Sequence, residues 1–419
     1  MPARSPGLGG AEAGAPASAA RARATPGPSL PLGAARISRA ALIGRVATSA
    51  LSVRLASGNE LTQASIDPVP DVVEKSMPTA EVRPMCMMSA LAVTSIVLSI
   101  GASPDVATPP ADSPRIAYAA HHDGNWDVYV VGDDGVGATR LTTRREQERF
   151  PLWSPDGRRI AYGVQTSNGW ELWVMDADGG DARRLSAGIA AKGHRAWSPD
   201  GARLAFERGT RDDHDVYTIR HDGTGLVRLT TAPGDDGNPS WSPDGARVAF
   251  SSTRDGNTEI YVVRADGSGE TRLTRDAADD LSPAWSPDGS TIAFLSTRDG
   301  GRDVYRMRPD GNGVGRLTVG SAVTKDVPAW SPDGSRLAYH AAHGRDYDIE
   351  VVRVADGART RIAPTSAYEG MYAWSPDGAR MAFVSGRDST DALYVVDANG
   401  SRVRRLTTAP SLNPAWKPR

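Results

Sequence analysis

Polar and charged side chains precede each of seven regularly spaced tryptophans, and they differ from one copy to the next. Carboxylates and guanidinium groups can pair with a charged ligand, and imidazole, amide and phenol groups can form hydrogen bonds. Variation against a repeated background is where a binding preference would reside, although drift in solvent-exposed loops explains it equally well. The candidate ligand-binding residues are Glu148, Arg149, His194, Arg195, Asp236, Asn238, Asp280, Lys325, Asp326, Glu369 and Tyr372. Arg195 and Tyr372 stand where five of the seven copies have proline.

The sequence lacks the short motifs of common enzyme chemistries. It contains no Gly-x-Ser-x-Gly nucleophile elbow, phosphate-binding loop, His-Glu-x-x-His or Cys-x-x-Cys. Its seven histidines are scattered, and only His194 falls on a strand that leads into a tryptophan. Asp-Gly turns such as Asp266-Gly267 resemble the start of a calcium loop but lack its later carboxylate, so we predict plain hairpin turns. We therefore expect no catalytic residue, no metal site and no cofactor.

The tryptophans recur about every 44 residues, and six of them open the string Trp-Ser-Pro-Asp-Gly. Proline at the second turn position and glycine at the last predict a tight turn after each one. In the unit that begins at Trp241, short apolar runs predict strands over 248–251, 260–263 and 272–274 and in the approach to Trp285. Each unit is thus predicted to hold four short strands. The tryptophans are Trp153, Trp197, Trp241, Trp285, Trp330, Trp374 and Trp416.

Four antiparallel strands in a repeat of this length are typical of one blade of a β-propeller. The first unit lacks a tryptophan strand, and the sequence ends just after Trp416. We therefore predict that the C-terminal strand pairs with the three strands within residues 114–142, which leaves no open sheet edge. The sequence predicts an all-β fold over residues 113–419, a seven-bladed β-propeller of four-stranded antiparallel blades with a ring closed in this way.

The residues repeated in every unit are predicted to be structural. Each tryptophan should pack between neighbouring blades, where burial of its ring is stabilising. The innermost strand of a blade lines the central channel, so the candidate residues should surround the channel mouth. Adjacent Arg and Asp residues on the same face, such as Arg254-Asp255, are predicted to be exposed ion pairs of little energetic value. A recurrent acid before the second apolar strand predicts a blade-locking hydrogen bond at Asp127, Glu171, Asp215, Glu259, Asp303 and Asp348.

The composition bears on compartment and partners. The net charge is −2 and no long basic run lies in the repeats, so we expect no nucleic-acid partner. Residues 1–84 are rich in Ala, Pro, Gly and Arg and are predicted to be disordered. A start at an internal methionine, which would leave them outside the natural product, is an alternative. Residues 85–103 have the layout of a secretory signal peptide, with an uncleaved membrane anchor as the alternative, and residues 104–112 form a linker.

The strings Trp197-Ser198-Pro199-Asp200-Gly201, Leu204-Ala205-Phe206 and Asp215-Val216-Tyr217, repeated over residues 113–419, resemble the TolB-type β-propeller repeat. The resemblance implies an exported, non-catalytic module, periplasmic or extracellular, that binds a protein, peptide or cell-envelope ligand. TolB-type proteins imply an envelope lipoprotein as partner, but they have six blades behind an α/β domain, whereas this sequence shows seven units. We expect a monomer.

The same repeat also occurs in oligogalacturonate lyases and in the propellers of peptidases, which leaves two alternatives open. A metal-dependent lyase would bring several histidines and a glutamine to one channel, but the repeats contain only Gln147 and Gln165. A peptidase-associated propeller would act with a separate hydrolase.

Overall fold

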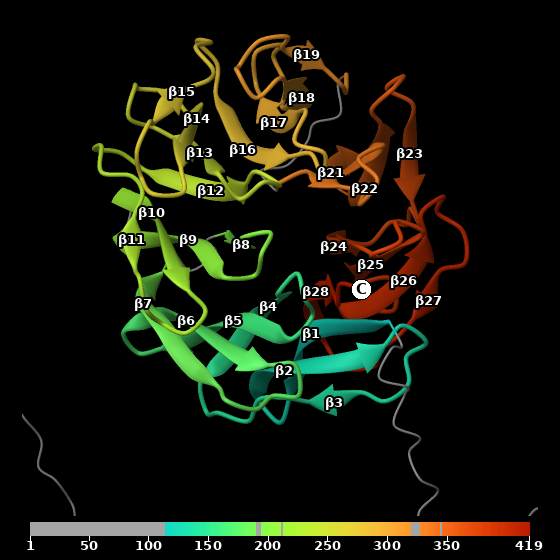
Figure 1. Cartoon of the computed structure of the whole chain (residues 1–419). Coiled ribbons are helices and arrows are strands. Elements are labelled where there is room, and N and C mark those ends of the chain that lie inside the picture. Colours follow the sequence, from blue (N-terminus) through green and yellow to red (C-terminus); the bar gives the residue numbers. More distant parts are fainter. Residues whose placement is uncertain (1–113, 190–193, 211–212, 320–326, 344–345) are drawn as a thin grey trace, which may run out of the picture. The chain divides into compact units, whose positions relative to one another are not determined.

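The computed structural model describes residues 114–189, 194–210, 213–319, 327–343 and 346–419. The disordered segment, the signal peptide or anchor and the linker predicted within residues 1–112 lie outside these residues. Every regular element in the described ranges is a β-strand, which confirms the all-β prediction. The strands form antiparallel sheets that follow one another in sequence order (Figure 1).

The sheets hold four strands each, except that two repeats join into one sheet of eight. The first sheet holds β28 (Ser411–Trp416), β1 (Arg115–His122), β2 (Asn125–Gly132) and β3 (Thr139–Arg140). The eight-stranded sheet holds β4 (Gln147–Trp153), β5 (Arg159–Thr166), β6 (Gly169–Asp176), β7 (Arg183–Ile189), β8 (Arg195–Trp197), β9 (Arg203–Thr210), β10 (Asp213–Arg220) and β11 (Val227–Arg228). A single pair, Ile189 with Arg208, joins its two halves.

The other four sheets repeat one strand order, in which each strand pairs with the next along the sequence. The third repeat forms β12 (Asp236–Trp241), β13 (Arg247–Ser252), β14 (Glu259–Arg264) and β15 (Thr271–Arg272). The fourth forms β16 (Asp280–Trp285), β17 (Ile292–Ser296), β18 (Asp303–Met307) and β19 (Gly315–Arg316). The fifth forms β20 (Ala329–Trp330), β21 (Arg336–His343), β22 (Asp346–Arg353) and β23 (Arg359–Ile362). The sixth forms β24 (Glu369–Trp374), β25 (Arg380–Ser385), β26 (Ala392–Asp397) and β27 (Arg404–Arg405).

The Ser-Pro-Asp-Gly strings form the predicted tight turns. In the turn after β8, the amide of Gly201 donates to the carbonyl of Ser198 at 2.8 Å, and Gly201 has a φ of 67° that suits glycine. The Ser198 hydroxyl donates to the Asp200 carboxylate at 2.5 Å and accepts the amide of Arg203 at 2.8 Å. Serine and aspartate therefore close the turn with their side chains and fix the start of β9.

The first and last described strands pair with each other, as predicted. Ile116 in β1 lies opposite Trp416 in β28, and Ala117 lies opposite Ala415. The amide of Lys417 donates to the carbonyl of Arg115 at 2.8 Å. Segments about 300 residues apart thus complete one four-stranded sheet.

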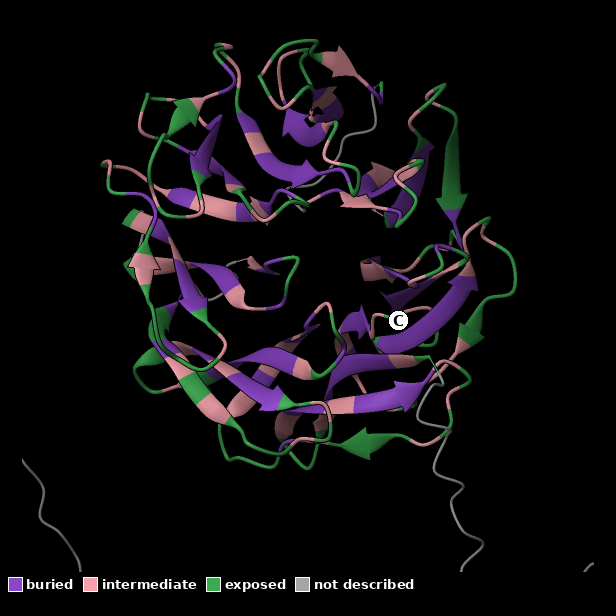
Figure 2. Ribbon diagram, viewed as in Figure 1, coloured by how far each residue is buried: buried purple, intermediate pink, exposed green. Residues whose placement is uncertain are grey.

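The strands that end in tryptophan are called the inner strands here: β4, β8, β12, β16, β20, β24 and β28. Figure 1 shows them on the side of each sheet nearest the centre of the described unit. Figure 2 shows that buried residues concentrate in the first strands of each sheet, whereas the last, short strand of each sheet is mostly exposed. The prediction of a third strand in every unit is correct, but in most sheets this outer strand is only two residues long.

Each tryptophan packs between two consecutive repeats, which confirms the predicted structural role. Trp285 lies in a hydrophobic cluster with Ile260 of the preceding sheet and Phe294 of its own. The described residues form seven such clusters, and one of them joins the sixth repeat to the first sheet through Leu393 and Ile116. Five tryptophans also donate their indole N–H, over 3.0–3.2 Å, to the carbonyl of the residue just before the tryptophan of the preceding repeat; they are Trp197, Trp241, Trp330, Trp374 and Trp416.

Candidate functional site

A backbone bulge occurs three residues before the tryptophan in five of the inner strands. The pairing register of these strands shifts at this point, and the bulged residue is left-handed with φ between 49° and 59°. Such a conformation costs about 1–3 kcal/mol in a residue other than glycine, and residues that adopt it are common near binding and active sites. The bulged residues are Phe150, Asn238, Ser282, Met371 and Asn413. These bulged strands carry the candidate residues Glu148, Arg149, Asp236, Asn238, Asp280, Glu369 and Tyr372. His194 directly precedes β8 and Arg195 begins it, but the pairing of β8 shows no register shift, and Lys325 and Asp326 are outside the described residues.

Three candidate carboxylates are fully buried and already paired. Asp236 lies 2.8 Å from Arg254, Asp280 lies 2.7 Å from Arg298, and Glu369 pairs with Arg387. Burial raises the pKa of all three carboxyls above the usual value, and the arginines oppose this shift. These contacts favour a structural role for the three carboxylates.

The prediction that adjacent Arg and Asp residues form exposed ion pairs is wrong. The Arg254 side chain is only 10% exposed and turns inward to Asp236. Its neighbour Asp255 turns away from it and accepts the hydroxyl of Tyr261. Both residues lie in the turn between β13 and β14, where their side chains contact different partners. The same division holds for Arg298 with Asp299 and for Arg387 with Asp388.

The recurrent acid before each second apolar strand locks its sheet, as predicted. Asp303 lies at 2.5 Å from Arg316 of the outer strand and accepts the Thr318 hydroxyl at 2.8 Å. Equivalent carboxylate–arginine pairs join Asp127 to Arg140, Glu171 to Arg184, Asp215 to Arg228, Glu259 to Arg272 and Asp348 to Arg361.

Glu148 lacks the close arginine partner that the buried inner-strand carboxylates Asp236, Asp280 and Glu369 have. It is the second residue of β4 and holds the position that Asp236 holds in β12, but Val164 and Thr166 stand where Ser252 and Arg254 stand in the third repeat. The guanidinium nitrogen that contacts Glu148 is Arg144 Nε at 3.6 Å, and Thr142 and the Arg144 backbone only partly stabilise the charged form of the carboxyl. Burial raises the pKa of the Glu148 carboxyl to about 7.

Replacing Glu148 with glutamine should change how stability depends on pH. Between pH 4.5 and about 7 the unfolded carboxyl ionises while the folded one keeps its proton, so the wild type loses stability as the pH rises. The glutamine variant lacks this loss. We expect it to gain about 3 kcal/mol over the wild type between pH 4 and pH 7.5. Urea unfolding followed by tryptophan fluorescence at both pH values measures the difference.

The matched control is Glu146→Gln, because Glu146 is exposed and lies two residues away. Its difference from wild type should not change with pH. A Glu148→Gln difference that is equally independent of pH would mean that this carboxyl titrates alike in the folded and unfolded protein.

A group of aromatic and cationic side chains lies at the bulge of β4. The guanidinium of Arg195 lies 5.4 Å from the centre of the Phe150 ring, and Phe150 lies 5.3 Å from Trp170. Arg149 lies 4.6 Å from the Trp126 ring and donates to Gln147 at 2.6 Å. Burial lowers the pKa of Arg195 to about 10 and also lowers that of Arg149. This group attracts negatively charged groups.

Two more candidates meet at a residue that the sequence did not single out. The backbone amides of His194 and Asn238 donate to one carboxylate oxygen of Glu207, at 3.3 Å and 2.6 Å. Glu207 lies in β9, directly after the buried Phe206. Its position is variable, with Ala119, Gly163, Ser251, Leu295, His340 and Val384 in the other repeats. A comparison of that position among repeats would have identified it.

Tyr372 lies apart from the arginine group, in β24. Its hydroxyl donates to the carbonyl of Ala338 at 3.1 Å, and its ring meets His340 edge to face at 4.9 Å. Tyr368, which is 41% exposed, lies 6.4 Å from the same imidazole. Neither neighbour was singled out from the sequence, although His340 holds the same variable position as Glu207 and the same comparison among repeats would have identified it.

The described ranges lack two further features, a metal-binding cluster and a membrane-spanning helix. No group of three or more His, Cys, Asp or Glu side chains within these ranges is placed to hold a metal ion. No helix in that part of the protein has the length and apolar character needed to cross a bilayer.

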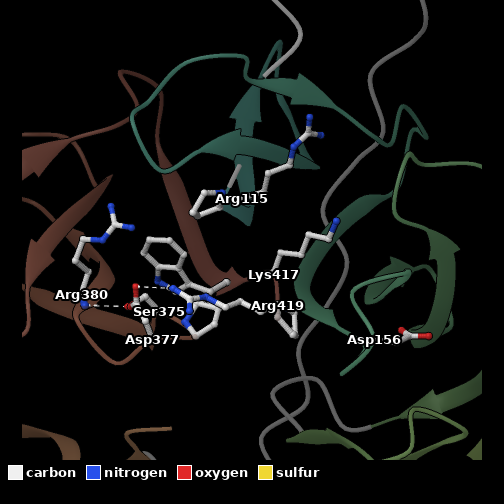
Figure 3. Close-up of a pocket in the computed structure, with 11 residues that line it drawn as sticks. Arg115, Asp156, Ser375, Asp377, Arg380, Lys417 and Arg419 are labelled. Carbon is white, nitrogen blue, oxygen red and sulfur yellow. Dashed lines mark hydrogen bonds and ion pairs between the residues drawn. The ribbon is translucent and has the colours of Figure 1, made fainter. Parts of the chain in front are cut away.

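One cavity of about 350 Å³ lies at the opposite ends of the inner strands, beside the Ser-Pro-Asp-Gly turns (Figure 3). Trp416, Lys417 and Arg115 line it where β28 meets β1. Arg419 is paired with Asp377 at 3.1 Å. None of the described candidate residues lines this cavity.

Four-stranded antiparallel sheets that pack through a repeated tryptophan define a β-propeller. Residues 188–258, 230–327 and 320–419 match the TolB beta propeller domain, and together they cover more than half of the sequence. The protein belongs to the TolB beta propeller family. No curated protein matches it.

Solved structures share the fold at low identity. TolB from Acinetobacter baumannii is 20% identical with a TM-score of 0.50, over 73% of this protein and 67% of that one. An oligogalacturonate lyase from Vibrio parahaemolyticus is 16% identical with a TM-score of 0.57, over 67% and 85%. A puromycin-hydrolyzing peptidase from Mycobacterium tuberculosis is 16% identical with a TM-score of 0.52, over 70% and 53%. At these identities the likeness concerns the fold alone.

Proposed function

We propose that this protein is an exported, non-catalytic TolB-like propeller that binds a protein or peptide partner at the cell envelope. The observation that carries the proposal is the arginine and aromatic group at β4 and β8, which departs from the protein's own repeat. Repeated positions supply structural contacts such as the tryptophan packing and the carboxylate–arginine locks. The departures at Arg195 and Tyr372 instead place a cation and a phenol ring where other repeats have proline.

The proposal includes a closed ring of seven blades and a monomeric state. Pairing of β28 with β1 supports closure, and so does the hydrophobic cluster between the sixth repeat and the first sheet. A closed ring would place the bulges of the inner strands around one channel mouth. Family membership and the resemblance to periplasmic TolB proteins support export and a protein partner.

An affinity capture experiment tests the proposed function. Wild-type protein, an Arg195→Ala/Tyr372→Ala variant and an Arg158→Ala control are immobilised and exposed to an envelope extract of the source organism. Arg158 is exposed on the turn side, away from the candidate residues. We expect the double variant to lose at least one partner that the wild type and the control retain. Equal recovery of every partner by all three proteins would contradict the proposed binding face.

A further inference from the structure

Arg149 and Arg195 differ from the other inward-facing arginines because neither forms a direct ion pair with a carboxylate in the described ranges. The charge of Glu207 acts on Arg195 from beyond ion-pair distance and partly opposes the fall in its pKa. Arg254, Arg298 and Arg387 each pair with a buried acid of an inner strand. Among the described residues, no carboxylate lies within ion-pair distance of Arg149 or Arg195.

The charges of these two arginines are also poorly solvated. Nε of both residues and Nη2 of Arg195 are shielded from solvent and have no hydrogen-bond partner in the described part of the protein. Leaving a buried charge and its donors unpaired is costly. Both residues as a whole are partly exposed. An anion that arrives there gains a strong attraction because water competes weakly.

Aromatic rings hold the guanidinium groups in place. Arg149 lies over Trp126 and Arg195 over Phe150, and Trp170 supports Phe150 from the side. A fixed guanidinium fork matches the two oxygens of a carboxylate. Sugars bind by stacking on open aromatic faces, but here the guanidinium groups already lie over the Trp126 and Phe150 rings. The arrangement therefore favours a carboxylate on a peptide over a carbohydrate.

The amide of Phe150 lacks the side-chain acceptor that equivalent amides have in other repeats. At the equivalent bulges, the amide of Asn238 donates to Glu207 at 2.6 Å and that of Ser282 donates to Ser251 at 2.9 Å. The residue that corresponds to Glu207 and Ser251 for the Phe150 bulge is Ala119, whose methyl group cannot accept a hydrogen bond.

We propose that Arg195 and Arg149, with the amide of Phe150, bind a carboxylate presented by a peptide segment of the partner. The carboxylate belongs to an acidic side chain or to the C-terminus of the peptide, which share the same chemistry. This inference rests on the proposed function and names the ligand group at its binding face.

Fluorescence anisotropy with four labelled pools of nine-residue peptides tests the inference on the full-length protein. The pools have randomised flanks, a central Glu or Gln, and a free or amidated C-terminus. We expect the Glu pool with an amidated C-terminus or the Gln pool with a free C-terminus to bind. The Gln pool with an amidated C-terminus, which lacks both carboxylates, should bind roughly ten-fold or more weakly. The comparison between the two single-carboxylate pools distinguishes the two sources.

Substitutions of Arg195 test whether this side chain binds the carboxylate. Arg195→Met should weaken binding of the preferred pool by roughly ten- to hundred-fold, and Arg195→Lys should weaken it less because it keeps the charge but loses the fork. The matched control is Arg208→Met, since Arg208 is also partly buried and lies 5.5 Å from the Tyr217 ring. It should bind within about two-fold of wild type. Thermal melting of each variant confirms that it is folded.

Equal binding of all four pools, no binding by any pool, or unchanged affinity in a folded Arg195→Met variant would overturn the inference. Binding of an oligogalacturonate without any peptide pool would also overturn it. If the peptides fail but envelope capture is still lost in the Arg195/Tyr372 variant, the proposed function stands and only the carboxylate assignment falls.

Discussion

Replacing Trp285 with alanine is expected to lower the free energy of unfolding by about 3–5 kcal/mol. The Trp285 side chain is 7% exposed and packs against residues of two consecutive sheets. Arg247 lies over its ring at 4.9 Å, so the change also removes a cation–π contact. The cavity would open between two sheets, where rigid strands on both sides limit collapse. Urea unfolding followed by far-ultraviolet circular dichroism measures the loss without relying on tryptophan fluorescence.

Two further variants serve as controls for this result. Trp285→Phe keeps an aromatic ring and should lose less than the alanine variant. Tyr347→Ala removes a ring that is 45% exposed and should cost less than about 1 kcal/mol. A Trp285→Ala loss as small as that of Tyr347→Ala would show that the indole is not part of a packed interface in solution.

Replacing Arg298 with methionine should cost about 3–5 kcal/mol at neutral pH, because it leaves a buried carboxylate without its cation. Arg298 Nη2 donates to both oxygens of Asp280, at 2.9 Å and 2.7 Å, and Nε donates to the Ser296 hydroxyl at 2.9 Å. Methionine keeps the aliphatic volume against Tyr305, so the main loss is electrostatic. Equilibrium unfolding at pH 7.5 measures it.

The pH dependence distinguishes this electrostatic loss from a packing defect. Burial already raises the pKa of Asp280 above its usual value, and the arginine opposes the shift. Without Arg298 the pKa should rise further, so protonation of the folded carboxyl relieves more of the loss at pH 5 than at pH 7.5. Arg308→Met is the control, since Arg308 is 65% exposed and its pair with Asp310 is a surface contact. A loss in Arg298→Met that is the same at both pH values would point to packing alone.

Local chemistry made the repeated part of this fold predictable from sequence. Turn residues such as Pro199 and Gly201, and apolar runs such as Leu204 to Phe206, specify the same turn and strand in each unit. The first unit lacks a tryptophan strand before Ile116, and the last segment supplies one that ends at Trp416. This match predicted that the two segments pair. These features depend on residues close in sequence or on a simple count.

The contacts of the candidate residues were harder to predict because they depend on neighbours in other repeats. Arg254 and Asp255 are adjacent in sequence, which suggested that they pair with each other. In the structure the arginine reaches Asp236 of the inner strand, 18 residues earlier. Glu148 lacks a close partner because Val164 and Thr166 stand where the third repeat has Ser252 and Arg254, and the Arg195 guanidinium lies over Phe150 of the preceding repeat. Sequence reasoning found several of these residues but not their partners.

The pairing of β1 with β28 bears on how this protein is made. Residues of β1 leave the ribosome about 300 residues before those of β28, which takes roughly 15–60 seconds at ordinary synthesis rates. Throughout that interval one side of β1 offers unpaired backbone groups to any other extended polypeptide. Aggregation during synthesis should therefore begin at Arg115–His122, and a chaperone that covers this edge would help the nascent protein most.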